Sequence, residues 1–196
     1  MAFAWITARF TFPGRDLLDA ILTLPLVLPP TVLGYYLIVV WGRNGWLGGW
    51  LHEHLGITLM FTWQGAVLAA TVVAFPLLFK SARAAFEGVN VDYEKAARIL
   101  GDTELQVFFR ITLPLAARGL VAGTMLAFAR AMGDFGATLM VAGNIEGRTQ
   151  TAAMAVFDAV QVGDYKLANT LVVIMSLVCI AILVLTNKLA ARRVRP

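Results

Sequence analysis

Charged residues are missing from long stretches of this 196-residue sequence. Asp, Glu, Lys and Arg are absent from residues 20–42, 55–79 and 167–187, and only Arg130 and Asp134 interrupt residues 119–145. Each stretch is long enough to cross a bilayer core, which takes about 20 apolar residues. Since 59% of the residues are hydrophobic and 14% are charged, a soluble domain is excluded. The sequence predicts an all-α, polytopic membrane bundle with about four full spans and a single domain over 1–196.

Residues that carry chemistry are also scarce. Cys179 is the single cysteine, which excludes a disulfide within the chain. His52 and His54 are the two histidines, and without a further Cys/His cluster we expect them in a wet, polar loop. No G-x-x-x-x-G-K-[ST] motif occurs, so no phosphate-binding loop can hydrolyse ATP. We therefore expect no catalytic residues, metal or bound cofactor in this chain.

Residues 87–118, the 87–118 loop, separate two apolar stretches and carry five acidic and four basic residues. Thr103 and Gln106 have the spacing of a capping box, which predicts a helix start. Gly101 suits the left-handed residue that ends a preceding helix starting near Asp92. A merely solvated loop needs neither signal, so we expect two short helices offered to a soluble partner.

Basic residues orient the chain by the positive-inside rule. With the 87–118 loop and both termini in the cytoplasm, only Arg43, Arg148 and Lys166 fall outside, and Arg130 lies in a span. The other 12 of the 16 basic residues are then inside: Arg9, Arg15, Lys80, Arg83, Lys95, Arg98, Arg110, Arg118, Lys188, Arg192, Arg193 and Arg195. We predict a multi-pass protein with both termini cytoplasmic.

The N-terminal segment Met1–Phe12 is too short to span and has no cleavage site after an apolar core, so it is not a signal peptide. Its apolar residues lead into Arg9 and Arg15. We expect it to be the cytoplasmic end of a truncated N-terminal helix.

The first full span holds Pro25, Pro29 and Pro30, which remove backbone donors and should break the helix. Broken helices are tolerated in a bilayer where they are buried in protein or line a cavity. This span is a candidate pore wall, with Thr31 offering a hydroxyl near the break. A kink that serves only helix packing is the alternative.

The third full span, over 119–145, carries Arg130 and Asp134 four residues apart. On a continuous helix the two would share a face and pair. They would then lock the bundle, or lie with Thr138 beside the translocation path. Small residues allow close helix contact at Gly133 and Gly136, and again at Gly119-x-x-x-Gly123. Apolar residues in 151–163 follow a helical repeat and predict a short helix at the outer surface.

A gapped pattern in the 87–118 loop resembles the cytoplasmic loop of bacterial ABC importer permeases of the type I, binding-protein-dependent class. The resemblance implies that this loop docks on an ATPase subunit that uses ATP and Mg²⁺. The family's first motif residue, usually glutamate, falls on Lys95, with Glu94 one residue earlier, so either side chain could make the polar contact. The matching positions are Ala96, Ala97, Gly101, Ile111, Leu113 and Pro114.

The runs 29–36 and 130–151 resemble the molybdate branch of that family most closely and the sulfate branch next. The resemblance implies a bacterial inner-membrane permease for molybdate or tungstate that works with an extracytoplasmic oxyanion-binding protein; a permease for sulfate or another oxyanion is the alternative. So few helices cannot enclose a water-filled path alone, which predicts a homodimer, surrounded by lipid, with the pore on its two-fold axis. A membrane-anchored regulator with a helix–turn–helix loop is the remote alternative. The net charge of −1 in the loop argues against nucleic acid.

Overall fold

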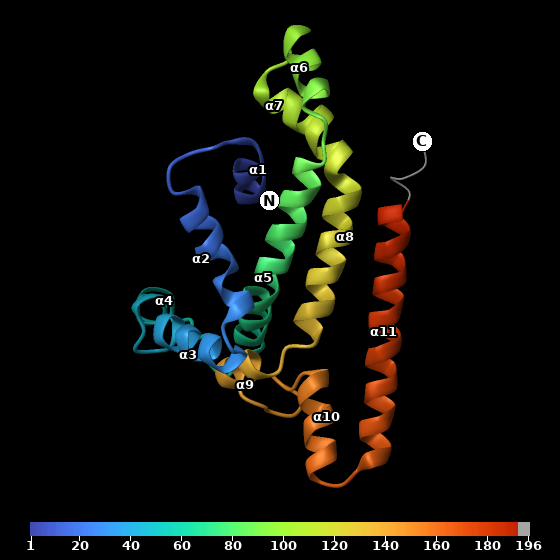
Figure 1. Cartoon of the computed structure of the whole chain (residues 1–196). Coiled ribbons are helices and arrows are strands. Elements are labelled where there is room, and N and C mark those ends of the chain that lie inside the picture. Colours follow the sequence, from blue (N-terminus) through green and yellow to red (C-terminus); the bar gives the residue numbers. More distant parts are fainter. Residues whose placement is uncertain (192–196) are drawn as a thin grey trace. The chain divides into compact units, whose positions relative to one another are not determined.

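The computed structural model describes residues 1–191, for 189–191 the backbone only, and every regular element within this part is helical (Figure 1). The all-α prediction is confirmed. Arg192, Arg193 and Arg195, which the orientation argument counted, lie outside the described residues. In chain order the helices are α1 (Ala2–Arg9), α2 (Arg15–Val27), α3 (Pro30–Trp41), α4 (Trp46–Leu55), α5 (Trp63–Glu87), α6 (Val91–Ile99), α7 (Glu104–Val107), the π-helix η1 (Phe108–Thr112), α8 (Leu113–Met132), α9 (Gly136–Ala142), α10 (Ala152–Gln161) and α11 (Tyr165–Ala191).

Three helices in the described part are long and apolar enough to cross a bilayer, and they are Trp63–Glu87, Glu104–Met132 and Tyr165–Lys188. The pair α2 and α3 makes a fourth span if the two are counted as one broken helix. The predicted number of spans is therefore confirmed. The predicted bounds of the third span are wrong, because α8 ends at Met132 and the short α9 begins only at Gly136.

The break between α2 and α3 bends the chain by 115°. Pro25 lies inside α2, Pro29 precedes α3 and Pro30 is its first residue. A proline has no N–H to donate and is best tolerated in the first turn of a helix, so α3 starts afresh at Pro30 instead of continuing α2. The predicted break is confirmed.

The described chain divides into two compact units, and three segments form the first: 1–23, 76–127 and 182–191. This unit contains α1, the 87–118 loop and the C-terminal part of α11. Within it α5 and α8 approach closely, because a Cβ added at Gly119 would lie 2.7 Å from the Cβ of Ala85 and one at Gly123 would lie 2.5 Å from the Cβ of Ser81. The predicted small-residue contact at Gly119 and Gly123 is confirmed.

The second unit comprises residues 24–75 and 128–181. Its core is made by apolar side chains of α3, α5 and α9: Leu33, Leu37, Ala69, Val73, Ala137 and Val141. The predicted short helix in 151–163 is α10, whose start is capped by Thr151. His52 and His54 lie in helix α4, so the prediction of a loop there is wrong. Gly56, in a left-handed conformation, ends α4 one residue after Leu55.

Candidate functional site

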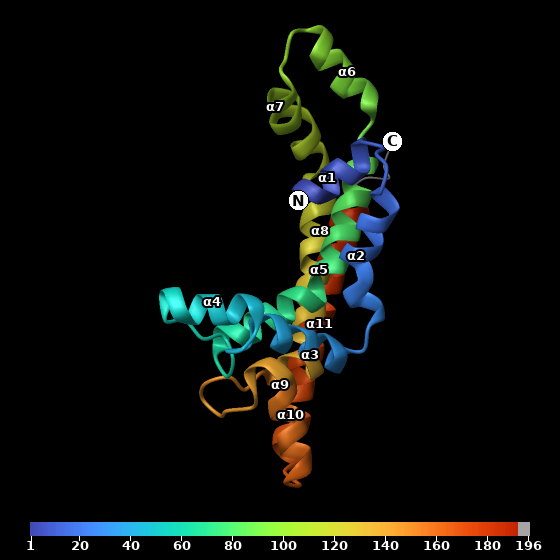
Figure 2. The ribbon, with the colours of Figure 1, turned by 90° about the vertical axis from the view of Figure 1, so that its left-hand side faces the viewer.

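The 87–118 loop folds as a helical hairpin of α6 and α7 (Figure 2). Asn90 caps α6, since its side-chain oxygen accepts from the Asp92 N–H at 2.9 Å. Gly101 follows the last residues of α6 with φ +94°, and its N–H donates to the Arg98 carbonyl at 3.0 Å. Only glycine adopts this conformation without strain. Both predicted features, a helix starting near Asp92 and a left-handed Gly101, are confirmed.

The second helix of the hairpin begins with the predicted capping box. The Thr103 N–H donates to the Gln106 side chain at 2.8 Å, and the Gln106 N–H donates to Thr103 Oγ1 at 3.4 Å. After one turn of α7 the helix widens into η1, where the Leu113 N–H reaches back to the Phe108 carbonyl. Pro114 has no N–H for the next bond of the ladder, and its ring needs room beside the preceding turn. The wide turn supplies that room, so α7, η1 and α8 continue as one helix.

Large apolar side chains are exposed at the tip of the hairpin. Ile99 is 85% exposed, Leu100 86% and Leu105 72%. We call these three residues the apolar tip. Such a patch marks a surface for another protein when it is exposed on a soluble segment. The sequence already indicated this patch, because it has apolar residues at the ends of the two predicted helices, where a solvated loop would have polar ones.

The predicted docking residues divide by burial. Lys95, Ala96, Gly101 and Pro114 are exposed, whereas Glu94 and Ala97 are buried and Ile111 and Leu113 are half-buried. A partner could therefore reach the exposed residues of this set, whereas the buried and half-buried ones pack inside the protein.

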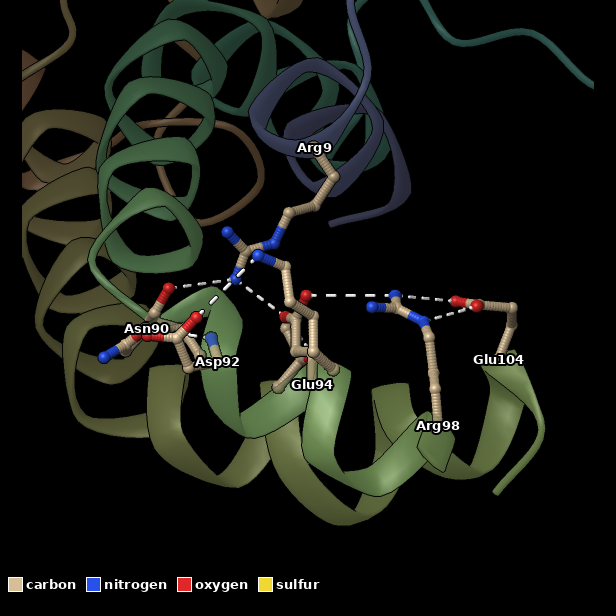
Figure 3. A network of polar contacts seen from close by, with 9 residues as sticks. Arg9, Asn90, Asp92, Glu94, Arg98 and Glu104 are labelled. Carbon is tan, nitrogen blue, oxygen red and sulfur yellow. Dashed lines mark hydrogen bonds and ion pairs between the residues drawn. The ribbon is translucent and has the colours of Figure 1, made fainter. Parts of the chain in front are cut away.

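An ion pair joins the two arms of the hairpin. Arg98 on α6 donates to both carboxylate oxygens of Glu104, at 2.6 Å from Nε and 3.0 Å from Nη2 (Figure 3). This bond and the charge of Glu104 raise the pKa of Arg98 above its ordinary value. Arg110 lies 3.4 Å from Asp102 and adds a second, exposed pair. A bidentate arginine–carboxylate pair has a defined geometry, so this pair links the end of α6 to the start of α7.

Glu94 points into the protein instead of toward a partner. It is 3% exposed, and its Oε1 accepts from Arg9 Nη2 at 2.7 Å and from Thr112 Oγ1 at 2.7 Å. Lys95, by contrast, has a side chain that is 66% exposed and lies 3.8 Å from Asp92. Of the two candidates for an external polar contact, only Lys95 is available. Sequence reasoning treated Arg9 as one cytoplasmic charge among many, because its partner lies 85 residues away.

The candidate pathway residues all fall in the second unit. The start of α3 lies against the start of α9, since a Cβ added at Gly136 would be 3.1 Å from the Cβ of Pro30 and 3.5 Å from the Thr31 nitrogen. Thr31 at the helix break is therefore close to α9, which carries Thr138. Thr138 is buried.

The predicted ion pair of Arg130 and Asp134 is wrong. The i,i+4 spacing joins two side chains only on a continuous helix, and α8 ends at Met132 between them. Asp134 is 2% exposed and instead binds the start of α9, where its Oδ2 accepts from the Thr138 N–H at 2.9 Å and from Thr138 Oγ1 at 2.6 Å. Arg130 is half-buried and makes no ion pair with the described residues. Asp134 thus acts as a local cap.

Metal-binding side chains do not gather anywhere in residues 1–191: no group of three or more His, Cys, Asp or Glu could hold an ion there. The same part of the chain instead contains apolar spans, one broken helix and an exposed helical hairpin. Together they are the features of a helical membrane protein that carries an exposed hairpin between two of its spans.

The family of binding-protein-dependent transport system inner membrane components matches residues 1–196, and the chain belongs to this family. It is 48% identical over 184 residues to the molybdenum transport system permease protein ModB of Escherichia coli K12, covering 93% of this chain and 80% of ModB. It is 44% identical over 168 residues to the putative molybdenum transport system permease protein YvgM of Bacillus subtilis 168, covering 86% and 74%. The sulfate transport system permease protein CysT of E. coli K12 is 35% identical over 192 residues, covering 98% and 69%.

Solved structures agree on the fold. An inward-facing MetNI methionine ABC transporter superposes with a TM-score of 0.70 at 17% identity, over 99% of this chain and 84% of the other. A bacterial alginate ABC transporter gives a TM-score of 0.67 at 15% identity, over 99% and 71%. The fold is that of an ABC importer permease, and the alternative of a membrane-anchored DNA-binding regulator is excluded.

Proposed function

We propose that the chain is the permease subunit through which an ATP-driven importer moves molybdate, or its near-isostere tungstate, into the cell. The observation that carries this proposal is the identity of 48% to a molybdenum permease over 93% of the chain, against 35% to a sulfate permease over a similar length. An extracytoplasmic binding protein delivers the oxyanion, and separate ATPase subunits supply the energy.

The 87–118 loop is the surface on which the ATPase docks. Two observations support this: the apolar tip is exposed, and the Arg98–Glu104 pair holds both arms of the hairpin. The apolar tip enters a groove of the ATPase, while Lys95 makes the polar contact that Glu94 cannot reach. A rigid lever of this kind passes motion between proteins without absorbing it in its own flexing.

Two copies of the chain form the pathway. One copy has at most four spans in its described part, too few to enclose a water-filled path, and a closed pair places the path on a two-fold axis. Thr31 at the break between α2 and α3 lies in the same unit as Asp134 and Thr138. This grouping supports a wall or gate of the pathway in the second unit.

Uptake by the complete importer tests the substrate. We expect proteoliposomes with the permease, its ATPase and its binding protein to accumulate radiolabelled molybdate in the presence of ATP. Excess unlabelled tungstate should reduce that uptake strongly, and equal sulfate should reduce it little. Saturable sulfate uptake that molybdate does not compete away would contradict the assignment and favour the sulfate alternative.

The orientation places both termini and the 87–118 loop in the cytoplasm and α4 and the 146–166 segment outside. It is supported by the first unit, which groups α1, the loop and the end of α11. We expect an impermeant maleimide to label intact cells at Glu53→Cys and Arg148→Cys but not at Asp92→Cys or Lys188→Cys, each in a Cys179→Ser background. All four positions are exposed.

Permeabilised cells provide the control for this labelling, because all four cysteines should then react. Within α4, Glu53 is preferred to Gly48 as the labelling position, because any side chain at Gly48 would collide with the carbonyls of Trp41 and Gly42. Labelling of Asp92→Cys in intact cells, with none at Glu53→Cys, would reverse the orientation.

A further inference from the structure

The N-terminal helix α1 contacts the 87–118 loop at two separate points. Arg9, the last residue of α1, reaches Glu94 on α6 at 2.7 Å and the Val89 carbonyl just before α6 at 3.2 Å (Figure 3). Trp5, one turn earlier, packs edge to face on Phe108 at the start of η1, with ring centroids 5.3 Å apart. The helix therefore bridges both arms of the hairpin near its base.

Glu94 is the centre of this arrangement. One oxygen, Oε1, accepts hydrogen bonds from Arg9 and from Thr112, so a single buried carboxylate joins α1, α6 and the end of η1. We call Arg9, Glu94 and Thr112 the polar clamp. A buried carboxylate is costly to desolvate and is retained only when it is paired and hydrogen-bonded. Removal of Arg9 therefore leaves Glu94 with only one, much longer ion-pair contact, to Arg98 Nη2 at 4.0 Å.

Contacts from α1 and α6 also bracket the π-helix. Trp5 contacts Phe108, the first residue of η1, and Glu94 contacts Thr112, the last. A π-turn inside an α-helix is a local irregularity that is frequent at functional sites. Contacts from α1 and α6 at both ends of this turn hold α7 and α8 in one fixed relation.

We propose that Arg9 is a positioning residue, which ties α1 to the docking hairpin through the polar clamp, so that a displacement of α6 moves α1 and α8 with it. This inference rests on the proposed function, because it takes the ATPase as the source of the displacement. The clamp lies on the buried side of α6, whereas Lys95 and the apolar tip lie on exposed surface. Transmission of motion and ATPase docking therefore use different side chains and can be separated by mutation.

The test compares Arg9→Met, Arg9→Lys and the double variant Arg9→Met/Glu94→Gln in the reconstituted importer. Arg9→Met should still purify with the ATPase and hydrolyse ATP, while oxyanion uptake per ATP falls on the order of tenfold. Arg9→Lys keeps the charge and should recover most of the uptake. The double variant removes the bare carboxylate, so it should restore the yield of folded protein but leave uptake per ATP low.

Arg15→Met is the matched control. Arg15 is the first residue of α2 and pairs at 3.7 Å with Glu87 at the end of α5, and no hydrogen bond or ion pair joins it to α6 among the described residues. We expect its uptake per ATP to stay within about twofold of wild type. A second readout needs no substrate: amide hydrogen exchange over residues 91–112 should be faster in Arg9→Met and in the double variant than in wild type or Arg15→Met.

Three outcomes overturn the clamp. These are wild-type uptake per ATP in Arg9→Met, regained uptake per ATP in the double variant, and loss of the ATPase from Arg9→Met. Regained uptake in the double variant would reduce Arg9 to a neutraliser of buried charge, and a lost ATPase would make it a docking residue. Failure of the proposed function is a separate result, since wild type itself would then take up no oxyanion while the exchange comparison still judges the clamp.

Discussion

Replacing Gly101 by proline is expected to abolish copurification of the permease with its ATPase, while the variant still inserts and dimerises. Gly101 has φ +94°, and its N–H donates to the Arg98 carbonyl at 3.0 Å. Proline holds φ near −65° and has no N–H to donate. The substitution therefore removes a hydrogen bond and forces the turn between α6 and α7 open. A cost of about 3 kcal/mol or more lowers the population of the docking-competent hairpin roughly a hundredfold.

Two variants control this experiment. Gly101→Ala adds a Cβ that meets nothing within 4 Å. The only cost is then that of holding alanine in the left-handed conformation, about 1–2 kcal/mol, so this variant should keep part of the association with the ATPase. Gly163→Pro makes the same change after α10, where Gly163 has φ +78° and donates to the Val160 carbonyl. It should leave ATPase association unchanged. Normal copurification of Gly101→Pro would show that the hairpin is not the docking surface.

Replacing Gly34 by leucine should have the largest effect in the second unit. A Cβ at this position would lie 2.6 Å from the Cβ of Met140 and 3.2 Å from the Cα of Ala137. Neither atom can swing away, because each belongs to or is fixed by the backbone of α9. Overpacking commonly costs about 1–3 kcal/mol and more where the backbone must shift. We expect a several-fold loss of assembled permease and of uptake, measured by size-exclusion chromatography and by transport.

Gly133→Ala is the matched control for Gly34→Leu, because the nearest heavy atom to an added Cβ there is 3.8 Å away. Its assembly and uptake should remain close to wild type. A Gly34→Leu variant that assembles and transports normally would mean that α3 and α9 do not pack as described.

Local signals accounted for much of the fold. The capping box at Thr103, the left-handed Gly101 and the break at Pro29 each depend on interactions within a few residues, so the sequence was enough to predict them. The end of the third span at Met132 was not predictable in this way. Residues 133–135 carry no proline, and the interruption depends on the Asp134 side chain binding Thr138 at the start of α9.

Long-range contacts account for what sequence reasoning missed in the candidate site. Nothing local to Arg9 indicates that it meets Glu94, and nothing local to Glu94 indicates that it turns inward while Lys95 turns out. The hydrophobic pattern and the charge count assign both residues to the cytoplasmic side, but they do not predict which side chains each residue contacts. The π-helix was missed for a related reason, since a wide turn before Pro114 does not alter the helical pattern of apolar residues.

The apolar tip has a consequence for how such a subunit is made and handled. The apolar tip is an exposed hydrophobic surface on a loop whose two helices are capped by residues next to them in the sequence. A newly inserted permease therefore carries a site for unspecific association until its proper partner covers it. Under the proposed docking, the ATPase would cover this surface as well as drive transport, and balanced synthesis of the two subunits would keep the permease from clustering in the membrane.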